Sequence, residues 1–116
     1  MNIFAIVVSA ALAGLVSQQV LAADAEASPR GAAVFNHWCA PCHAAGPGHP
    51  ATASLAIKYK GEKPAVLEQR TDLTPDIIKF FVRYGFANMT AFRKTEITDA
   101  DLNDLAKYLS SSPSEK

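Results

Sequence analysis

Two cysteines and a histidine within five consecutive positions are the residues of this chain best suited to chemistry. They stand in the segment Cys39-Ala40-Pro41-Cys42-His43, and the sequence contains no other cysteine. On a helical turn, thiols three positions apart point to the same side. Such a pair can close a disulfide, supply half of a zinc site, attack disulfides as a redox couple, or bond covalently to a prosthetic group.

The order C-x-x-C-H favours the last of these possibilities, because it is typical of covalent attachment of a c-type haem. Each thiol would add to one vinyl group of the haem, and the adjacent histidine would then lie beneath the ring and bind the iron. The sequence therefore predicts one covalently attached haem c, held by Cys39 and Cys42, with His43 as an iron ligand.

Two other kinds of site compete with the haem. A zinc site is disfavoured because the chain has no second C-x-x-C pair. A thioredoxin-like thiol–disulfide oxidoreductase is the sharper alternative, because Trp38 precedes the motif as in the active sites of those enzymes. That fold needs strands on both sides of the motif. Here Pro29–Trp38 has the periodicity of a helix, and no later segment has that of a buried strand.

A second axial ligand is expected from Met89, which is the only methionine besides Met1. A lone methionine more often fills a gap in a core, but Met89 stands in an irregular segment between polar residues, where a core residue is out of place. His37 is too close to the motif to reach the other face of a haem, and His49 belongs to a proline-rich loop on the His43 side. A thioether ligand opposite a histidine raises the iron reduction potential relative to two histidines.

The N-terminal segment has the pattern of a secretory signal peptide. Residues 1–23 contain no charged side chain, and the apolar run Ile3–Val16 covers about 14 residues, fewer than the roughly 20 that span a bilayer. Cleavage is expected after Ala22 or Ala23, where small residues follow the run. The segment is atypical in lacking Lys and Arg, and an uncleaved anchor is the alternative. We expect an exported, periplasmic protein without a membrane span after cleavage.

The rest of the chain is expected to form one small all-α domain. N-cap residues, prolines and glycine stops predict short helices or helical stretches over residues 29–38, 51–60, 64–70, 75–84 and 98–110. Short helices are marginal alone, so a large apolar ligand at the centre would give the long loops a surface to wrap. The predicted organisation is a signal peptide (1–22), a flexible lead (23–28), the domain (29–110) and a flexible tail (111–116).

The charge balance excludes one class of partner. Eleven basic and eleven acidic side chains cancel in the 116 residues, and neither half holds a block of like charge. Binding to nucleic acid through phosphate neutralisation normally needs a basic excess. We therefore expect no nucleic-acid partner.

Taken together, these residues resemble the class I cytochromes c, in particular the short bacterial monohaem proteins, over most of residues 29–109. Gly31 and Phe35, with Tyr108, are similar to the contact pair at which the first and last helices of that family cross. The resemblance implies the cytochrome c fold, with four to five short helices wrapped around one covalently attached haem.

Two loops carry the rest of the resemblance. The spacing from Pro50 to Gly61 is similar to the family's loop and short helix. It implies that the Pro50 carbonyl accepts a hydrogen bond from the free ring nitrogen of His43. Residues 88–92 resemble the family's Met-Pro-Ala-Phe ligand loop, with Thr90 where proline is usual. Since proline fixes φ, this departure loosens the loop around the expected iron ligand.

The function implied by the resemblance is that of a periplasmic one-electron carrier, not an enzyme, cycling Fe(III)/Fe(II) between redox partner proteins. Its donor would be a dehydrogenase, for example a flavoprotein, and its acceptor an oxidase or another cytochrome. Candidates for contact with a haem propionate are Arg83 and Tyr59. A basic rim for docking is expected from Lys58, Lys60, Lys63, Arg93 and Lys94.

A second function keeps this chemistry but makes the partner permanent. Residues 84–109 are more weakly similar to cytochrome subunits of periplasmic flavin-dependent methylhydroxylases that act on alkylphenols. An electron-accepting subunit of such a flavin-dependent dehydrogenase or hydroxylase needs a larger and more apolar interface than a free carrier does.

Overall fold

The computed structural model describes residues 28–116, so the predicted signal peptide and most of the predicted lead lie outside the described residues. Within them the only strand-like feature is an isolated bridge between Phe86 and Met89, and no helix is long and apolar enough to cross a membrane. The all-α fold expected from the sequence is confirmed. In chain order the elements are α1 (Pro29–Val34), the π-helical turn η1 (Phe35–Cys39), α2 (Ala40–His43), α3 (Pro50–Tyr59), the 3-10 turn η2 (Leu67–Gln69), α4 (Pro75–Tyr84), α5 (Asp99–Ser110) and the 3-10 turn η3 (Pro113–Glu115).

Three helices begin at the cap residues expected from the sequence. In each, a serine or threonine hydroxyl accepts a hydrogen bond from a backbone N–H of the first turn, which would otherwise have no partner. Proline at the first helical position supports the start of α1 and α4. The three bonds run from Gly31 N to Ser28, from Ile77 N to Thr74 and from Asp101 N to Thr98.

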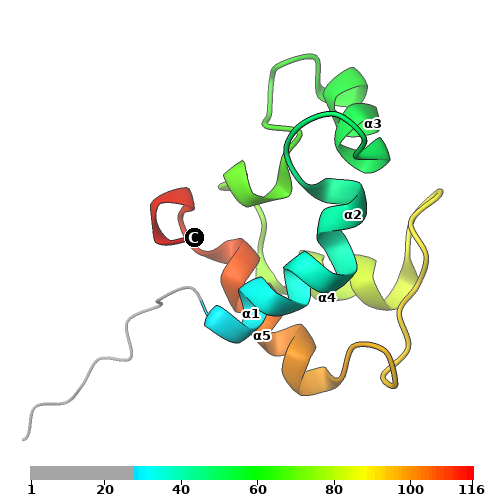
Figure 1. Ribbon diagram of the computed structural model, residues 1–116, viewed down its shortest axis with the longest axis vertical. Coiled ribbons are helices and arrows are strands. Elements are labelled where there is room, and N and C mark those ends of the chain that lie inside the picture. The colour runs from blue at the N-terminus through cyan, green and yellow to red at the C-terminus, as the bar shows by residue number, and fades with distance from the viewer. Residues whose placement is uncertain (1–27) are drawn as a thin grey trace, which may run out of the picture.

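Three other segments differ from the sequence-based expectation. The first helix does not end at residue 38 but runs through η1 into α2 and ends at His43, and Figure 1 shows that this helical segment bends between α1 and α2. The stretch 64–70 contains only the turn η2, because the residues flanking this turn have extended backbone. Residues 111–116, expected as a flexible tail, contain η3, and Lys116 Nζ donates a 3.1 Å hydrogen bond to the Glu68 carbonyl.

The core forms where α1 crosses α5 (Figure 1). A Cβ built on Gly31 would lie 2.6 Å from Tyr108 Cβ and closer still to the Asp104 carbonyl oxygen, so only glycine lets the two helices approach this closely. The fully buried Phe35 ring lies 6.0 Å from the Tyr108 ring, tilted by 48°. The expected contact of the terminal helices is confirmed. The remaining buried apolar side chains are Val34, Cys39, Ile78, Val82, Ile97, Leu102, Leu105, Ala106 and Leu109.

Tyr108 also ties the crossing to η2. Its hydroxyl donates a hydrogen bond to the carboxylate of Glu68. Burial of the phenol, together with this negatively charged acceptor, raises the pKa of Tyr108 to about 12. The hydroxyl therefore stays protonated as a donor throughout the neutral range, and α5 holds η2 in place.

Replacing Tyr108 with alanine should destabilise the fold strongly. Truncation of a buried aromatic side chain typically lowers the free energy of unfolding by about 3–5 kcal/mol. Tyr108→Phe keeps the ring and loses only the bond to the Glu68 carboxylate, so it should cost less, about 1.5–3 kcal/mol. Denaturant midpoints of the two variants and the parent check this ordering. Equal midpoints for Tyr108→Ala and the parent would show that the helix crossing does not limit stability.

Candidate functional site

A cavity of about 560 Å³ lies between α2, α3, α4 and the segment that follows α4. This volume is within the roughly 300–1,000 Å³ of ordinary ligand pockets. Its wall is mainly apolar and includes the aromatic rings of Trp38, Tyr59, Phe81, Phe86 and Phe92. The site is therefore shaped for a large apolar ligand, as the short helices and long loops suggested.

The cysteine motif forms one part of the cavity wall. Cys39, at the end of η1, is buried, while Cys42 in α2 is exposed, and both line the cavity. Burial, and to a lesser degree the neighbouring Cys42, raises the pKa of the Cys39 thiol to about 12. The first cysteine of a thiol oxidoreductase attacks as a thiolate, so this pKa works against that chemistry. The described residues also contain none of the strands that a thioredoxin-like fold requires.

His43 lies beside the cysteines in the same wall. Its Nδ1 atom is buried and has no hydrogen-bond partner among the described residues. The expected bond from this nitrogen to the Pro50 carbonyl is therefore absent; Pro50 begins α3, and its carbonyl accepts a 2.9 Å hydrogen bond from Ser54 Oγ. Burial lowers the pKa of His43, which favours the neutral imidazole that binds metals.

Met89 is the one proposed sixth ligand that lines the cavity. It comes from the segment after α4, whereas His43 comes from α2. His37 is exposed, stacks edge-on against Trp38 and is not part of the wall. His49 Nδ1 lies 3.1 Å from the Pro41 carbonyl oxygen, outside the cavity. The choice of Met89 over the two histidines is therefore consistent with the structure.

Backbone hydrogen bonds fix the position of Met89. Its N–H donates to the Phe86 carbonyl at 2.9 Å, and the Phe86 N–H donates back to the Met89 carbonyl at 3.1 Å. Further along, the Phe92 N–H donates to the Val82 carbonyl in α4 at 2.8 Å. The Phe92 ring then packs edge-on against Trp38 at 5.7 Å, which connects this segment to the cysteine motif. We call residues 86–92 the methionine loop.

Gly85 is the point at which the methionine loop folds back on α4. Its φ of 68° with ψ of 179° is a backbone conformation essentially restricted to glycine. A Cβ here would clash with the Met89 carbonyl oxygen and lie 3.0 Å from the Ala91 nitrogen. The sequence predicted that Gly85 ends the helix; the structure adds that it makes room for the backbone of Met89.

Arg83 has a structural role different from the expected contact with a haem propionate. Its guanidinium donates to the carbonyls of Phe92 at 3.1 Å and Ile97 at 2.9 Å, and it forms an ion pair with Asp99 at 2.9 Å. It does not line the cavity, whereas Tyr59, the other candidate, does. Arg83 therefore anchors the methionine loop and the segment after it to α4, and the propionate assignment for Arg83 is wrong.

Sequence reasoning missed Arg70. This residue follows η2, is only 6% exposed, and lines the cavity. The one sequence feature near Arg70 is Asp72, two positions later, and outside a helix or strand this spacing does not predict that the two side chains meet.

The residues present fit a covalently bound haem. Two thiols, an imidazole with a buried unpartnered nitrogen, and a thioether line one apolar cavity. Within residues 28–116, no group of three His, Cys, Asp or Glu side chains is placed to hold a metal ion by itself. Cys39 and Cys42 would carry the thioether bonds, and His43 and Met89 would bind the iron.

Comparison with known proteins gives one finding. The family model described as cytochrome c oxidase, cbb3-type, subunit III matches residues 26–109, which is most of the chain and contains the cysteine motif and Met89. No curated protein and no solved structure matches the chain.

Gly85→Ala should displace the methionine loop. A non-glycine residue in this backbone region costs about 1–3 kcal/mol, and the clash with the Met89 carbonyl adds to that cost. We expect a lower denaturant midpoint and, in the oxidised protein, loss of the weak red-end absorption band that sulfur–iron ligation produces. Gly48→Ala is the matched control, because Gly48 also has a positive φ, 88°, but a Cβ added there would meet no atom within 4 Å. A band that persists in both variants would show that Gly85 does not position Met89.

Cys42→Ala should remove one of the two covalent bonds to the haem. Expressed with a c-type maturation system, this variant should lose most of its holoprotein. Because Cys42 is exposed, its truncation removes no core packing, and the loss reports on attachment. Mass spectrometry checks the result: a parent chain that carries no added haem and has free thiols at both positions would contradict covalent attachment.

Proposed function

Since the chain belongs to the cytochrome c oxidase cbb3-type subunit III family, an electron-transfer family with covalently bound haem, we propose that it is a periplasmic one-electron carrier. Cys39 and Cys42 would hold a single haem c, and His43 and Met89 would bind its iron. The chain has one C-x-x-C-H motif, which supports a single haem. The predicted signal peptide supports export to the periplasm, where c-type haem is attached.

The placement of Met89 and His43 in one apolar cavity carries this proposal. When bound, the haem supplies one-electron exchange between its ferric and ferrous iron. With His43 and Met89 both bound to the iron, no position would remain on it for oxygen, peroxide or a substrate. The apolar wall excludes water, which disfavours the more positively charged ferric form and so raises the reduction potential. A thioether ligand would raise the potential further.

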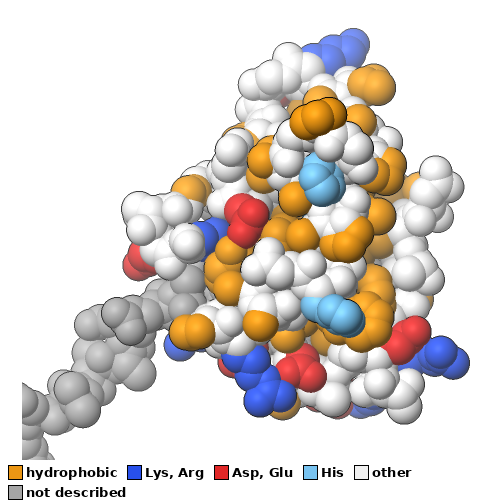
Figure 2. Space-filling view, in the orientation of Figure 1, with side chains coloured by type: hydrophobic (Ala, Val, Ile, Leu, Met, Phe, Trp, Pro, Cys, Tyr) orange, Lys and Arg blue, Asp and Glu red, His pale blue; other side chains and the backbone are white. Residues whose placement is uncertain are grey.

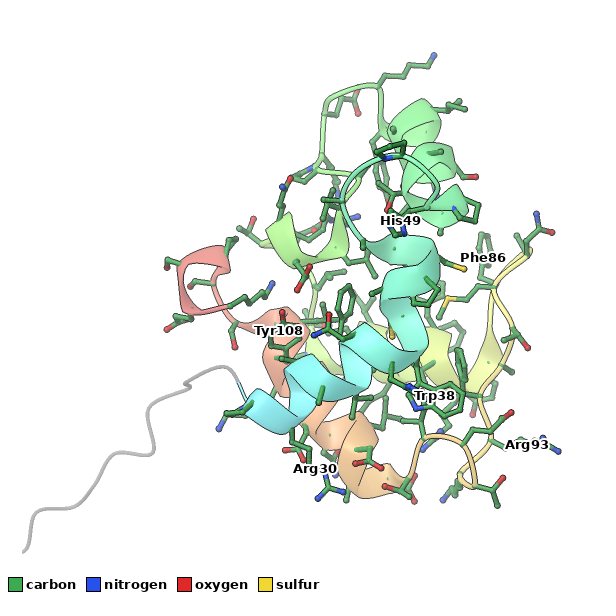
Figure 3. All side chains as sticks on the ribbon, viewed as in Figure 1. Arg30, Trp38, His49, Phe86, Arg93 and Tyr108 are labelled. Atoms are coloured by element: carbon green, nitrogen blue, oxygen red, sulfur yellow. The ribbon has the colours of Figure 1, made fainter. Side chains whose placement is uncertain are left out.

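The charged surface gives partial support for a basic docking rim. Three of the five candidates are paired with carboxylates: Lys63 with Asp72, Arg93 with Glu96, and Lys94 with Asp99. Lys58 and Lys60 form no ion pair with the described residues. Lys58 lines the cavity, and Lys60 caps the end of α3. In Figure 3, Arg93 lies at the outer edge of the molecule, below Phe86. Docking through charge would therefore depend mainly on Lys58 and Lys60.

An exposed aromatic surface favours the second function, a permanent subunit of a flavin-dependent dehydrogenase. Phe80 and Tyr84 of α4 are 54% and 74% exposed, and Phe86 beside them is 65% exposed. The three rings, with Phe81, form a continuous cluster with centroid separations of 5.0–5.9 Å. An exposed apolar patch of this kind is typical of a protein interface, and Phe81 and Phe86 extend it to the cavity wall.

The two functions differ in the lifetime of the complex, which gel filtration of the native protein from its source can separate. A free carrier elutes at the size of the monomer. A permanent subunit elutes together with its flavoprotein. Tyr84→Lys should then release the subunit, because burying an unpaired charge in the interface carries a large desolvation cost. Lys107 of α5 is exposed and lies outside the aromatic cluster, and Lys107→Gln serves as the control.

Met89→Ala is the direct test of the carrier function. The variant should keep its covalent haem, lose the red-end absorption band and have a lower reduction potential, because the sulfur ligand is gone. It should also bind carbon monoxide readily in the reduced form, whereas the parent should not. Spectra of both proteins before and after reduction with dithionite, with and without carbon monoxide, check each outcome.

The opposite result would change the function. If the parent already binds carbon monoxide readily and Met89→Ala binds it equally well, the iron has an open position. A ligand-binding or catalytic haem protein would then replace the electron carrier.

A further inference from the structure

The charged groups in the cavity wall are all of one sign. The wall contains Lys58 and Arg70, and its residues include no aspartate and no glutamate. A haem carries two propionate groups, which are anionic at neutral pH. The wall thus offers cations, and no carboxylate of its own, to a ligand with two negative charges.

Arg70 and Lys58 gather at one aromatic ring. The Arg70 Cζ atom lies 4.9 Å from the centroid of Tyr59, and Lys58 Nζ lies 5.6 Å from the same centroid. Stacking on the ring stabilises the guanidinium but does not neutralise its charge. Since Arg70 is 6% exposed, a cation at this depth is stable only with an anionic partner.

Asp72 supplies part of that partner. The Nε and Nη2 atoms of Arg70 donate to its two carboxylate oxygens at 2.5 and 2.7 Å, a bidentate pair, and Lys63 Nζ donates to the same carboxylate at 2.8 Å. Asp72 is partly exposed and does not line the cavity. One carboxylate thus serves two cations, of which only Arg70 lines the cavity, so Asp72 compensates the charge of Arg70 only in part.

The guanidinium still has donors to offer. An arginine has five N–H groups, and two of them are used by Asp72. The nearby carboxylate of Glu68 is engaged elsewhere, as the acceptor for the Tyr108 hydroxyl. Arg83, the arginine first expected to meet a propionate, is bound to two carbonyls and Asp99. Arg70 is therefore the buried arginine placed to bind an anion in the cavity.

We propose that Arg70 binds a haem propionate. Asp72 holds the guanidinium in position, Lys63 fixes Asp72, and the Tyr59 ring stacks against the guanidinium. The proposal rests on haem binding in the proposed function. It gives the haem a second attachment: the cysteine motif holds it through α2, and Arg70 holds its carboxylate side through the segment after η2. Arg70 is then a binding residue that also adjusts the potential of the iron, because it sets the charge that the propionate presents.

Nuclear magnetic resonance can test the contact directly. In the reduced holoprotein labelled with ¹⁵N, the side-chain N–H signals of Arg70 should show cross-peaks to the methylene protons of a haem propionate. Arg70→Lys identifies these signals by removing them. Cross-peaks from Arg70 to Tyr59 alone, with none to the propionate, would overturn the proposal.

The pH dependence of the reduction potential provides a second readout that a purely structural role would not move. A cation beside a carboxylate keeps the carboxylate ionised to lower pH. Ionisation stabilises the ferric form, so the potential falls as pH rises through the propionate pKa. Arg70→Gln should shift this fall to higher pH, whereas Arg70→Lys, which keeps the charge, should leave it near the parent position.

Arg93→Gln is the matched control for this measurement. It removes the same charge from a side chain that is 79% exposed and paired with Glu96, away from the cavity wall. If Arg70→Gln and Arg93→Gln give the same pH dependence as the parent, Arg70 does not bind a propionate. Should Arg70→Gln fail to fold, the cross-peaks of the parent protein decide the question.

The test of the Arg70–propionate contact and the test of the carrier function can fail independently of each other. A parent protein that binds carbon monoxide readily contradicts the carrier function, but its reduced, ligand-bound form still reports the Arg70 cross-peaks. A parent with the expected axial ligation and no Arg70 cross-peak contradicts only the inference on Arg70.

Discussion

The close approach of α1 and α5 at Gly31 is the constraint on which the rest of this structure depends. The described part of the chain has short helices and a small core, and the largest contact in that core is the crossing of its first and last helices. The crossing holds Phe35 beside Tyr108, and Tyr108 in turn holds Glu68 and with it η2. Since α1 continues through η1 into the cysteine motif, fixing α1 on α5 also fixes one wall of the cavity.

The cavity is built from segments that would not order themselves alone. The methionine loop has one isolated bridge and no helix, and the segment around η2 has a single turn. Each is instead held by specific polar contacts: Arg83 and Gly85 for the loop, Arg70 and Asp72 after η2. Figure 2 shows charged side chains along the lower edge of one face and at its top and left, while its centre is mainly apolar or uncharged. The molecule thus places much of its charge in structural pairs and leaves the ligand cavity without acids among the described residues.

The sequence predicted correctly those features that depend on residues close together in the chain. Cap residues such as Thr74 and Thr98 predicted helix starts correctly. The cysteine motif and the elimination that favoured Met89 pointed to residues that line one cavity. Features that depend on tertiary contacts were not predictable in this way. The Pro50 carbonyl was assigned to His43 by resemblance, but α3 begins there and uses it internally. The roles of Arg70 and Arg83 could not be distinguished, since burial and partners distant in sequence separate them.

The π-helical turn η1 gives the cysteine motif its angular register. The Ala40 N–H donates to the Phe35 carbonyl, five positions back, so this turn holds one residue more than an α-helical turn. Each residue of an α-helix advances by about 100° around the axis. Without the wider turn, a helix anchored at Gly31 would present the thiols rotated by about a quarter-turn around its axis. Insertions and deletions between Phe35 and Cys39 should therefore be far less tolerated than substitutions at exposed Asn36 or His37, since a change of length would rotate the motif while leaving every helix intact.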